Sequence, residues 1–222
     1  MKKCTILTIL LLSTVLISKG QDIRQFYLYA YNHALFNPAA GGESGRHNIA
    51  INGQLNHFSN DYTFHNNFTQ GTLCYDGNIK KLHSGIGAIG YYSLGATTFK
   101  KASLIYSYKL LLNSKTTLSI GVRPTVSKEV IDFSKFQAIN PDDPLLRDDK
   151  LKLVEPDLDL GIWYNSDGYY GGIALNNVFK HVYNYGDDLK GTDFFGYRSL
   201  TIMGGKKIDL PINYYRPIHF LD

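Results

Sequence analysis

The chain has 222 residues, a formal net charge of +4, and a content of 14% aromatic and 19% charged residues. This length fits one domain, because all-β barrels often exceed about 200 residues as a single unit. The charge is too small, and its lysines and arginines too dispersed, for a nucleic-acid-binding surface. With 17 tyrosines, 12 phenylalanines and 21 glycines, the composition is typical of β-structure.

The N-terminus has the features of an export signal. Lys2 and Lys3 precede an apolar run over residues 4–17, and small residues follow up to Gly20. This order is typical of a signal peptide, which predicts Sec-dependent export and cleavage between Gly20 and Gln21. A membrane anchor is the alternative, but about 14 apolar residues are fewer than the roughly 20 that a spanning helix needs.

Removal of the signal would leave Cys74 as the only cysteine, since the other is Cys4. No intramolecular disulfide is then possible. A lone cysteine in a strand-like run is more often a small buried apolar residue than a nucleophile. A catalytic thiol would need electropositive surroundings, which the sequence does not display.

The rest of the chain alternates between apolar and polar residues with the period of a β-strand. One face of each expected strand is apolar and rich in tyrosine, and the other carries Asn, Gln, Ser, Lys or Arg. Leu118, Ile120 and Val122, for example, alternate with Ser119 and Arg123. Eight strands are predicted, at residues 46–57, 64–75, 84–93, 101–111, 116–127, 157–164, 169–177 and 197–207, with a ninth at about residues 210–221.

Strand and loop lengths favour a membrane barrel over a soluble sandwich. Several predicted strands have about 10 to 12 residues, near the length that crosses a bilayer, whereas about five or six is usual in soluble proteins. The predicted connections after the second, fourth and sixth strands are short, and residues 130–156 and 178–196 form long loops. Outer-membrane barrels alternate short periplasmic turns with long external loops in this way.

Aromatic residues give further support to a membrane barrel. They fall near the ends of predicted strands or on their apolar faces, as expected for girdles at two membrane interfaces. The alternative is the ordinary aromatic core of a sandwich. The residues concerned are Tyr91, Tyr92, Tyr106, Tyr108, Trp163, Tyr164, Tyr169, Tyr170 and Tyr197.

Short motifs follow one another along nearly the whole mature chain. A Gln-Asp stretch begins at Gln21, and residues 37–42 read Asn-Pro-Ala-Ala-Gly-Gly. Residues 118–122 read Leu-Ser-Ile-Gly-Val, residues 140–144 read Asn-Pro-Asp-Asp-Pro, and residues 156–164 read Pro-Asp-Leu-Asp-Leu-Gly-Ile-Trp-Tyr. In this order they resemble the PorP/SprF family, outer-membrane proteins of the type IX secretion system in Bacteroidetes.

The resemblance implies an antiparallel transmembrane β-barrel of the outer membrane that supports secretion, or holds adhesins or gliding filaments at the cell surface. The implied partners are outer-membrane lipid, other subunits of the secretion system and a secreted surface protein. The motif residues that could make contacts are Asn37, Pro38, Ala39, Gly41, Pro156, Asp157, Gly161 and Tyr164. Asp142, Asp143 and Pro144 are expected in an external loop that could contact a partner.

The implied organisation is a signal at residues 1–20, a periplasmic or plug-like segment at 21–45 and a barrel at 46–222. By turn chemistry alone, residues 37–42 are a turn that directs the chain into the first strand. The family forms a barrel of about fourteen strands, and bacterial barrels have an even, closed count. The resemblance therefore implies either a truncated member or a smaller barrel.

No catalytic or metal-binding constellation is apparent. The sequence has no Gly-x-Ser-x-Gly elbow, His-Glu-x-x-His, phosphate loop or Cys-x-x-Cys, so we expect no enzyme, cofactor or metal site. His57 and His65 could meet across the first hairpin and His47 could join them, but a metal site also needs second-shell support that spacing cannot show. The alternative function is a passive pore lined by Asn52, Gln54 and Arg123, which predicts ion conductance.

Overall fold

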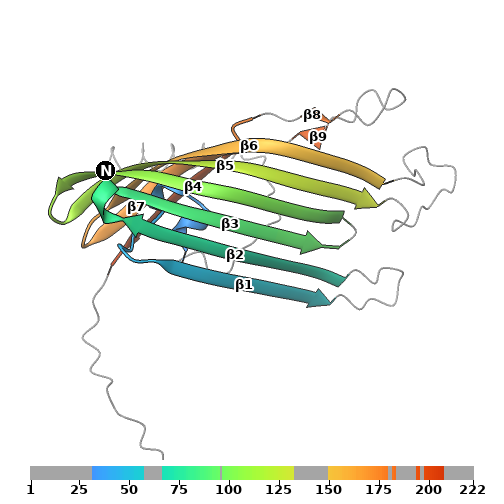
Figure 1. Cartoon of the computed structure of the whole chain (residues 1–222), viewed down its shortest axis with the longest axis horizontal. Coiled ribbons are helices and arrows are strands. Elements are labelled where there is room, and N and C mark those ends of the chain that lie inside the picture. Colours follow the sequence, from blue (N-terminus) through green and yellow to red (C-terminus); the bar gives the residue numbers. More distant parts are fainter. Residues whose placement is uncertain are drawn as a thin grey trace, which may run out of the picture.

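The computed structural model describes residues 32–57, 67–95, 97–132, 150–179, 182–183, 194–195 and 198–207. Eight strands form one antiparallel sheet in the order β1-β2-β3-β4-β5-β6-β7-β10, and the sheet curls along its width (Figure 1). The strands are β1 (Asn48–His57), β2 (Asn67–Ile79), β3 (Ser84–Leu94), β4 (Thr97–Asn113), β5 (Thr116–Asp132), β6 (Lys150–Asn165), β7 (Tyr169–Asn176) and β10 (Ser199–Lys206). The predicted all-β, antiparallel architecture is confirmed.

The described residues also form three short 3-10 turns and one two-stranded pairing outside the main sheet. Three 3-10 turns, η2 (His33–Leu35), η3 (Pro38–Ala40) and η4 (Lys80–Leu82), accompany the sheet, and β8 (Val182–Tyr183) pairs with β9 (Phe194–Phe195). No helix among the described residues is long and apolar enough to cross a membrane. The expected signal and ninth strand lie outside the described residues.

Three strands are much longer than predicted. β4 and β5 have 17 residues each and β6 has 16. The predicted loop over residues 130–156 is therefore wrong at both ends, because β5 and β6 stay paired from Thr117 opposite Asn165 to Asp132 opposite Lys150. Charged residues made these strand ends look like loop, although their alternation continues.

The connections differ between the two ends of the sheet. At one end, residues 80–83, 114–115 and 166–168 join β2 to β3, β4 to β5 and β6 to β7. At the other end, residues 58–66, 133–149 and 177–198 separate the paired strands. The prediction of short connections after the second, fourth and sixth strands is confirmed, and at the other end residues 95–96 alone join β3 to β4.

The polarity of the two faces is inverted relative to a water-soluble protein. Large apolar side chains are exposed on the convex face, for example Ile51 at 78% and Leu104 at 65%. Polar and charged side chains are buried on the concave face, including Arg123 at 5% and Asp159 at 0%. The alternation predicted from the sequence therefore places the apolar side outward and the polar side inward.

The buried apolar residues lie between the concave face and the segment that precedes β1. One cluster joins Ala34 to Cys74, Ile89 and Ile105, and a second joins Ala39 and Ala40 to Trp163. The fully buried position of Cys74 confirms that it acts as a small apolar residue.

The aromatic girdle is only partly as predicted. Tyr92, Tyr106, Tyr108, Tyr164 and Tyr169 are exposed on the outer side. Trp163 and Tyr91 are instead buried on the concave face, and Tyr170 packs beside Trp163. Proximity to a strand end misled the prediction, whereas the phase of the alternation places Trp163 on the same face as Asp159.

Candidate functional site

The candidate site is the concave face together with residues 32–45, here called the inner segment. Its turns η2 and η3 pack against each other, and η3 lies against β4, β5 and β6 (Figure 1). Local chemistry explains the fold of this segment. Pro38 occupies the first position of η3, where its fixed φ suits the turn, and Gly42 has a φ of 65°.

Asn37 binds the inner segment to the wall. Its side-chain oxygen accepts a hydrogen bond from Ala39 N at 2.9 Å, which caps η3. Its amide nitrogen donates to Ile162 O at 3.0 Å and to Ile173 O at 3.2 Å, two residues that face each other across β6 and β7. One buried side chain thus forms hydrogen bonds both within its own turn and with two backbone carbonyls of the wall.

Glycines in the wall create the space for this contact, and we call Gly85, Gly121, Gly161 and Gly172 the glycine floor. A Cβ at Gly161 would overlap Asn37 Oδ1, and one at Gly121 would overlap the backbone of Pro38 and Ala39. The glycine floor therefore allows the backbone of the inner segment to approach the sheet closely.

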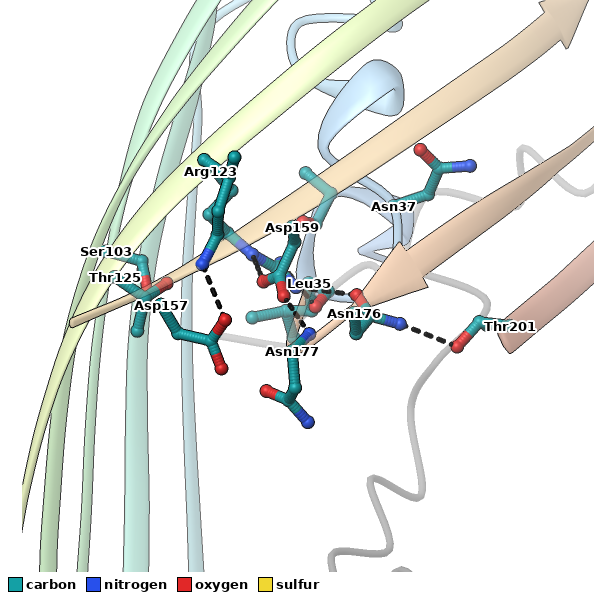
Figure 2. A network of polar contacts seen from close by, with 12 residues as sticks. Leu35, Asn37, Ser103, Arg123, Thr125, Asp157, Asp159, Asn176, Asn177 and Thr201 are labelled. Carbon is teal, nitrogen blue, oxygen red and sulfur yellow. Dashed lines mark hydrogen bonds and ion pairs between the residues drawn. The ribbon is translucent and has the colours of Figure 1, made fainter. Parts of the chain in front are cut away.

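Arg123 links β5 to the inner segment (Figure 2). Its guanidinium donates from Nε to Asp159 Oδ2 at 2.6 Å, and from Nη1 to Leu35 O at 2.7 Å and Ala34 O at 3.1 Å. Nη2 donates to Asn176 Oδ1 at 3.2 Å. The planar guanidinium, with its five N–H donors, therefore connects two strands of the wall with the carbonyls of η2.

Asp159 and Asn176 extend this network toward the end of the sheet. Asp159 Oδ1 accepts from Asn177 N at 2.8 Å, where the chain leaves β7. Asn176 Nδ2 donates to Thr201 Oγ1 at 2.9 Å on β10 (Figure 2). The polar chain thus runs across β5, β6, β7 and β10.

A second set of contacts holds the end of the inner segment near the short turns. Gly42 N donates to Asp76 Oδ2 at 2.9 Å, and Lys109 Nζ donates to Gly42 O and to Asn78 Oδ1. Ser107 Oγ donates to Gly41 O at 2.8 Å. The segment is therefore bound through its backbone at both ends.

His33 packs between aromatic rings on the inner face. Its ring centroid lies 5.0 Å from that of Trp163 and 4.6 Å from that of Tyr170, and Nδ1 forms a short hydrogen bond with Glu43 Oε1. These contacts bring the beginning and end of the inner segment together over β6 and β7.

The predicted motif residues separate into an inward and an outward group. Asn37, Pro38, Ala39, Gly41 and Gly161 meet at the contact between the inner segment and the glycine floor. The turn predicted at residues 37–42 is present, but it packs on the wall and does more than direct the chain into β1.

The other motif residues lie elsewhere. Asp157 Oδ1 accepts from Phe179 N at 3.1 Å and so holds the chain that follows β7. Pro156 and Tyr164 are exposed on the outer side of β6. Asp142, Asp143 and Pro144 lie outside the described residues.

Sequence reasoning missed the role of Arg123 and did not single out Asp159, Asn176 or Gly121. A signal was available for the ion pair, because Arg123 and Asp159 both fall on the polar faces of consecutive predicted strands. Among the described residues, no group of His, Cys, Asp and Glu could hold a metal ion. His57 and His65 lie where side chains are not described.

A curled antiparallel sheet with an apolar outer face and a polar, occupied inner face defines a membrane-embedded β-protein. The chain belongs to the PorP/SprF family: the model of this family, described as the type IX secretion system membrane protein PorP/SprF, matches residues 18–216. The family is a secretion-system membrane component and is not a family of enzymes. No curated protein and no solved structure matches the chain.

Proposed function

We propose that this chain is an outer-membrane component of the type IX secretion system that supports secretion or holds adhesins or gliding filaments at the cell surface. The observation that carries the proposal is the inverted polarity of the sheet in a chain that belongs to the PorP/SprF family. An apolar convex face is stable against acyl chains, whereas water would favour the opposite arrangement.

The two ends of the sheet have different tasks in this proposal. Short turns at residues 80–83, 114–115 and 166–168 face the periplasm, and residues 58–66, 133–149 and 177–198 face outward, as is usual for outer-membrane barrels. The outer loops contact a secreted surface protein, with Asp142, Asp143 and Pro144 as contact residues. The turns contact other subunits of the secretion system.

The inner segment acts as a plug in the same proposal, within a periplasmic or plug-like region over residues 21–45. Its support is the contact of residues 32–45 with the concave face through Asn37 and Arg123. A passive pore would need an open lumen, but Arg123, predicted to line it, is buried beneath the segment. Export with cleavage after Gly20 precedes insertion, and N-terminal sequencing of the mature protein tests that step.

The decisive experiment replaces residues 133–149 by a short Gly-Ser linker in the host bacterium. We expect the variant to reach the outer membrane in normal amount, while secreted or surface-attached protein falls. The matched control is Gly90→Ala on β3, where an added Cβ would meet no atom within 4 Å, so that the outer loops and the short turns stay unchanged. Normal secretion and surface attachment by the loop variant, together with single-channel conductance of the purified protein, would favour the pore.

A further inference from the structure

A row of lysines lies on the outer face at the long-loop end of β4, β5 and β6. Lys100, Lys128 and Lys152 are exposed and share the phase of the outward apolar residues on their strands. On β4 this phase continues into Ala102 and Leu104. The three lysines therefore point away from the concave face and are here called the lysine row.

The lysine row lies at the edge of the apolar outer face, and Val130, opposite Lys152, is the one outward apolar residue of β4 to β6 beyond Lys128. Below the lysine row, outward apolar residues extend over residues 102–110 of β4, 118–126 of β5 and 154–164 of β6, about 9 to 11 residues per strand, which is the length that crosses the hydrocarbon core at a tilt. The position directly beyond that length is the headgroup layer. Lysine suits the headgroup layer, because its apolar stem covers the apolar surface of the sheet while its ammonium group reaches the polar headgroups.

The register places like charges next to one another. Lys100 lies directly opposite Lys128, and Lys152 is diagonal to Lys128 because Lys128 pairs with Val154. Directly opposed like charges destabilise a sheet. Neighbouring strands are about 4.8 Å apart, so the three ammonium groups can converge on one anion, which removes the repulsion.

Nearby carboxylates do not neutralise the row. Asp132, the outward acid at this end of β5, pairs with Lys150 at 2.9 Å. Glu129 and Glu155 have the opposite phase and belong to the inward side. Within the part of the chain that the structure describes, no carboxylate pairs with Lys100, Lys128 or Lys152.

We propose that the lysine row binds the phosphorylated headgroup of a glycolipid in the outer leaflet, with the lipid's acyl chains against the apolar face below. Ammonium–phosphate contacts are strong charge-assisted hydrogen bonds, and Lys is a common phosphate ligand as a point charge. This inference rests on the proposed outward orientation of the long loops. It assigns a bound lipid to one sector of the wall, over β4 to β6.

The test measures binding of lipid A to the full-length protein in detergent micelles. The probes are bis-phosphorylated lipid A and its dephosphorylated form with the same acyl chains. We expect the phosphorylated form to bind at least about tenfold more tightly, as charge-assisted contacts imply. In the variant K100Q/K128Q/K152Q this preference falls to about twofold or less.

The control variant K80Q/K81Q/K115Q removes three exposed lysines at the short-turn end and retains the full preference. Equal binding of both lipids to the native protein would overturn the proposal, as would an equal loss in the two variants. Competition by inorganic phosphate at millimolar concentration distinguishes a lipid headgroup from free phosphate as the natural ligand. Effective displacement of lipid A by inorganic phosphate would show a site for free phosphate.

Folding is monitored separately by the migration of unboiled samples on gels. If the triple variant does not fold, the single variants K128Q and K128E replace it. We expect K128E to lose more of the preference for phosphorylated lipid A than K128Q. Because lipid binding is measured on purified protein, its failure leaves the secretion experiment unaffected, and the reverse also holds.

Discussion

Arg123 and Asp159 face each other directly across β5 and β6, with Arg123 Nε 2.6 Å from Asp159 Oδ2. Both side chains are buried, and the same guanidinium holds the carbonyls of Ala34 and Leu35. The ion pair thus fixes the orientation of a donor group that binds the inner segment. Because the charges of Arg123 and Asp159 neutralise each other, the inner segment can pack closely against this polar part of the concave face.

The first prediction concerns removal of one member of this pair. Asp159→Asn leaves the buried guanidinium of Arg123 without a counter-charge, and we expect the free energy of unfolding to fall by about 3 kcal/mol. Urea unfolding of the protein in detergent micelles measures this loss. Trp163, the only tryptophan, is fully buried beside the inner segment and reports the transition by fluorescence.

The matched control is the double variant Arg123→Met/Asp159→Leu. Replacement of a buried pair by apolar residues of similar volume is often close to neutral, so the double variant should be more stable than Asp159→Asn. A double variant less stable than the single one would show that the pair acts through its bonds to the inner segment and not through charge balance.

The second prediction concerns the glycine floor. A Cβ at Gly161 would overlap Asn37 Oδ1, so Gly161→Ala should displace the inner segment and destabilise the fold by about 1 to 3 kcal/mol. Cys74 measures the displacement in a Cys4→Ser background, because its thiol is buried in a cluster with Ala34. We expect maleimide to label Cys74 faster in the variant.

Gly90→Ala is the control for the second prediction. A Cβ at Gly90, on β3, would meet no atom within 4 Å, so the substitution should leave the labelling rate of Cys74 unchanged. Equal rates in Gly161→Ala and Gly90→Ala would mean that the inner segment tolerates a side chain beneath Asn37.

The third prediction separates the donor and acceptor roles of Asn37. Asn37→Asp keeps the oxygen that caps η3 but replaces the donor to Ile162 O and Ile173 O by a buried carboxylate oxygen. We expect it to be more destabilising than Asn37→Ala, which loses about 1 to 3 kcal/mol from unsatisfied partners. Urea unfolding at neutral pH compares the two, and the opposite order would make the cap the main contribution.

Sequence periodicity was sufficient for the parts of the fold that depend on local alternation. The phase of Leu118, Ser119 and Ile120 specifies which residues face outward, and the turn at residues 114–115 then fixes the register of β4 against β5. The same alternation places Arg123 and Asp159 on the polar faces of their strands, but their direct pairing depends on the register of β5 against β6, which the turn at residues 114–115 does not set.

The contact of the inner segment could not be predicted in this way. Asn37 and Ile173 are 136 residues apart, and their hydrogen bond depends on the curvature of the whole sheet. Gly121 and Gly161 resemble ordinary strand glycines, because only the segment packed above them shows why a side chain is excluded. The charged ends of β5 and β6 resembled a loop because charged residues take the place of apolar ones there, although the alternation of the two faces continues.

The fourth prediction tests the membrane-facing side. Leu160, Val122 and Tyr106 lie opposite one another at the middle of the apolar outer face, so Leu160→Arg should place a charge near the bilayer midplane. Such a charge costs about 2 to 4 kcal/mol at that depth but only about 0 to 1 near an interface. Leu112→Arg, at the exposed short-turn end of β4, is the matched control.

The measurement is folding into liposomes followed along a urea gradient, with Trp163 as the reporter. We expect the midpoint for Leu160→Arg to shift well below that of Leu112→Arg, because lipid solvates a guanidinium poorly at the midplane and well at the interface. Leu160→Ala shows how much of the shift comes from loss of the leucine. Equal effects of the two arginines would show that this face does not contact the hydrocarbon core. In water both positions would be solvated alike, and an arginine at position 160 would cost no more than one at position 112.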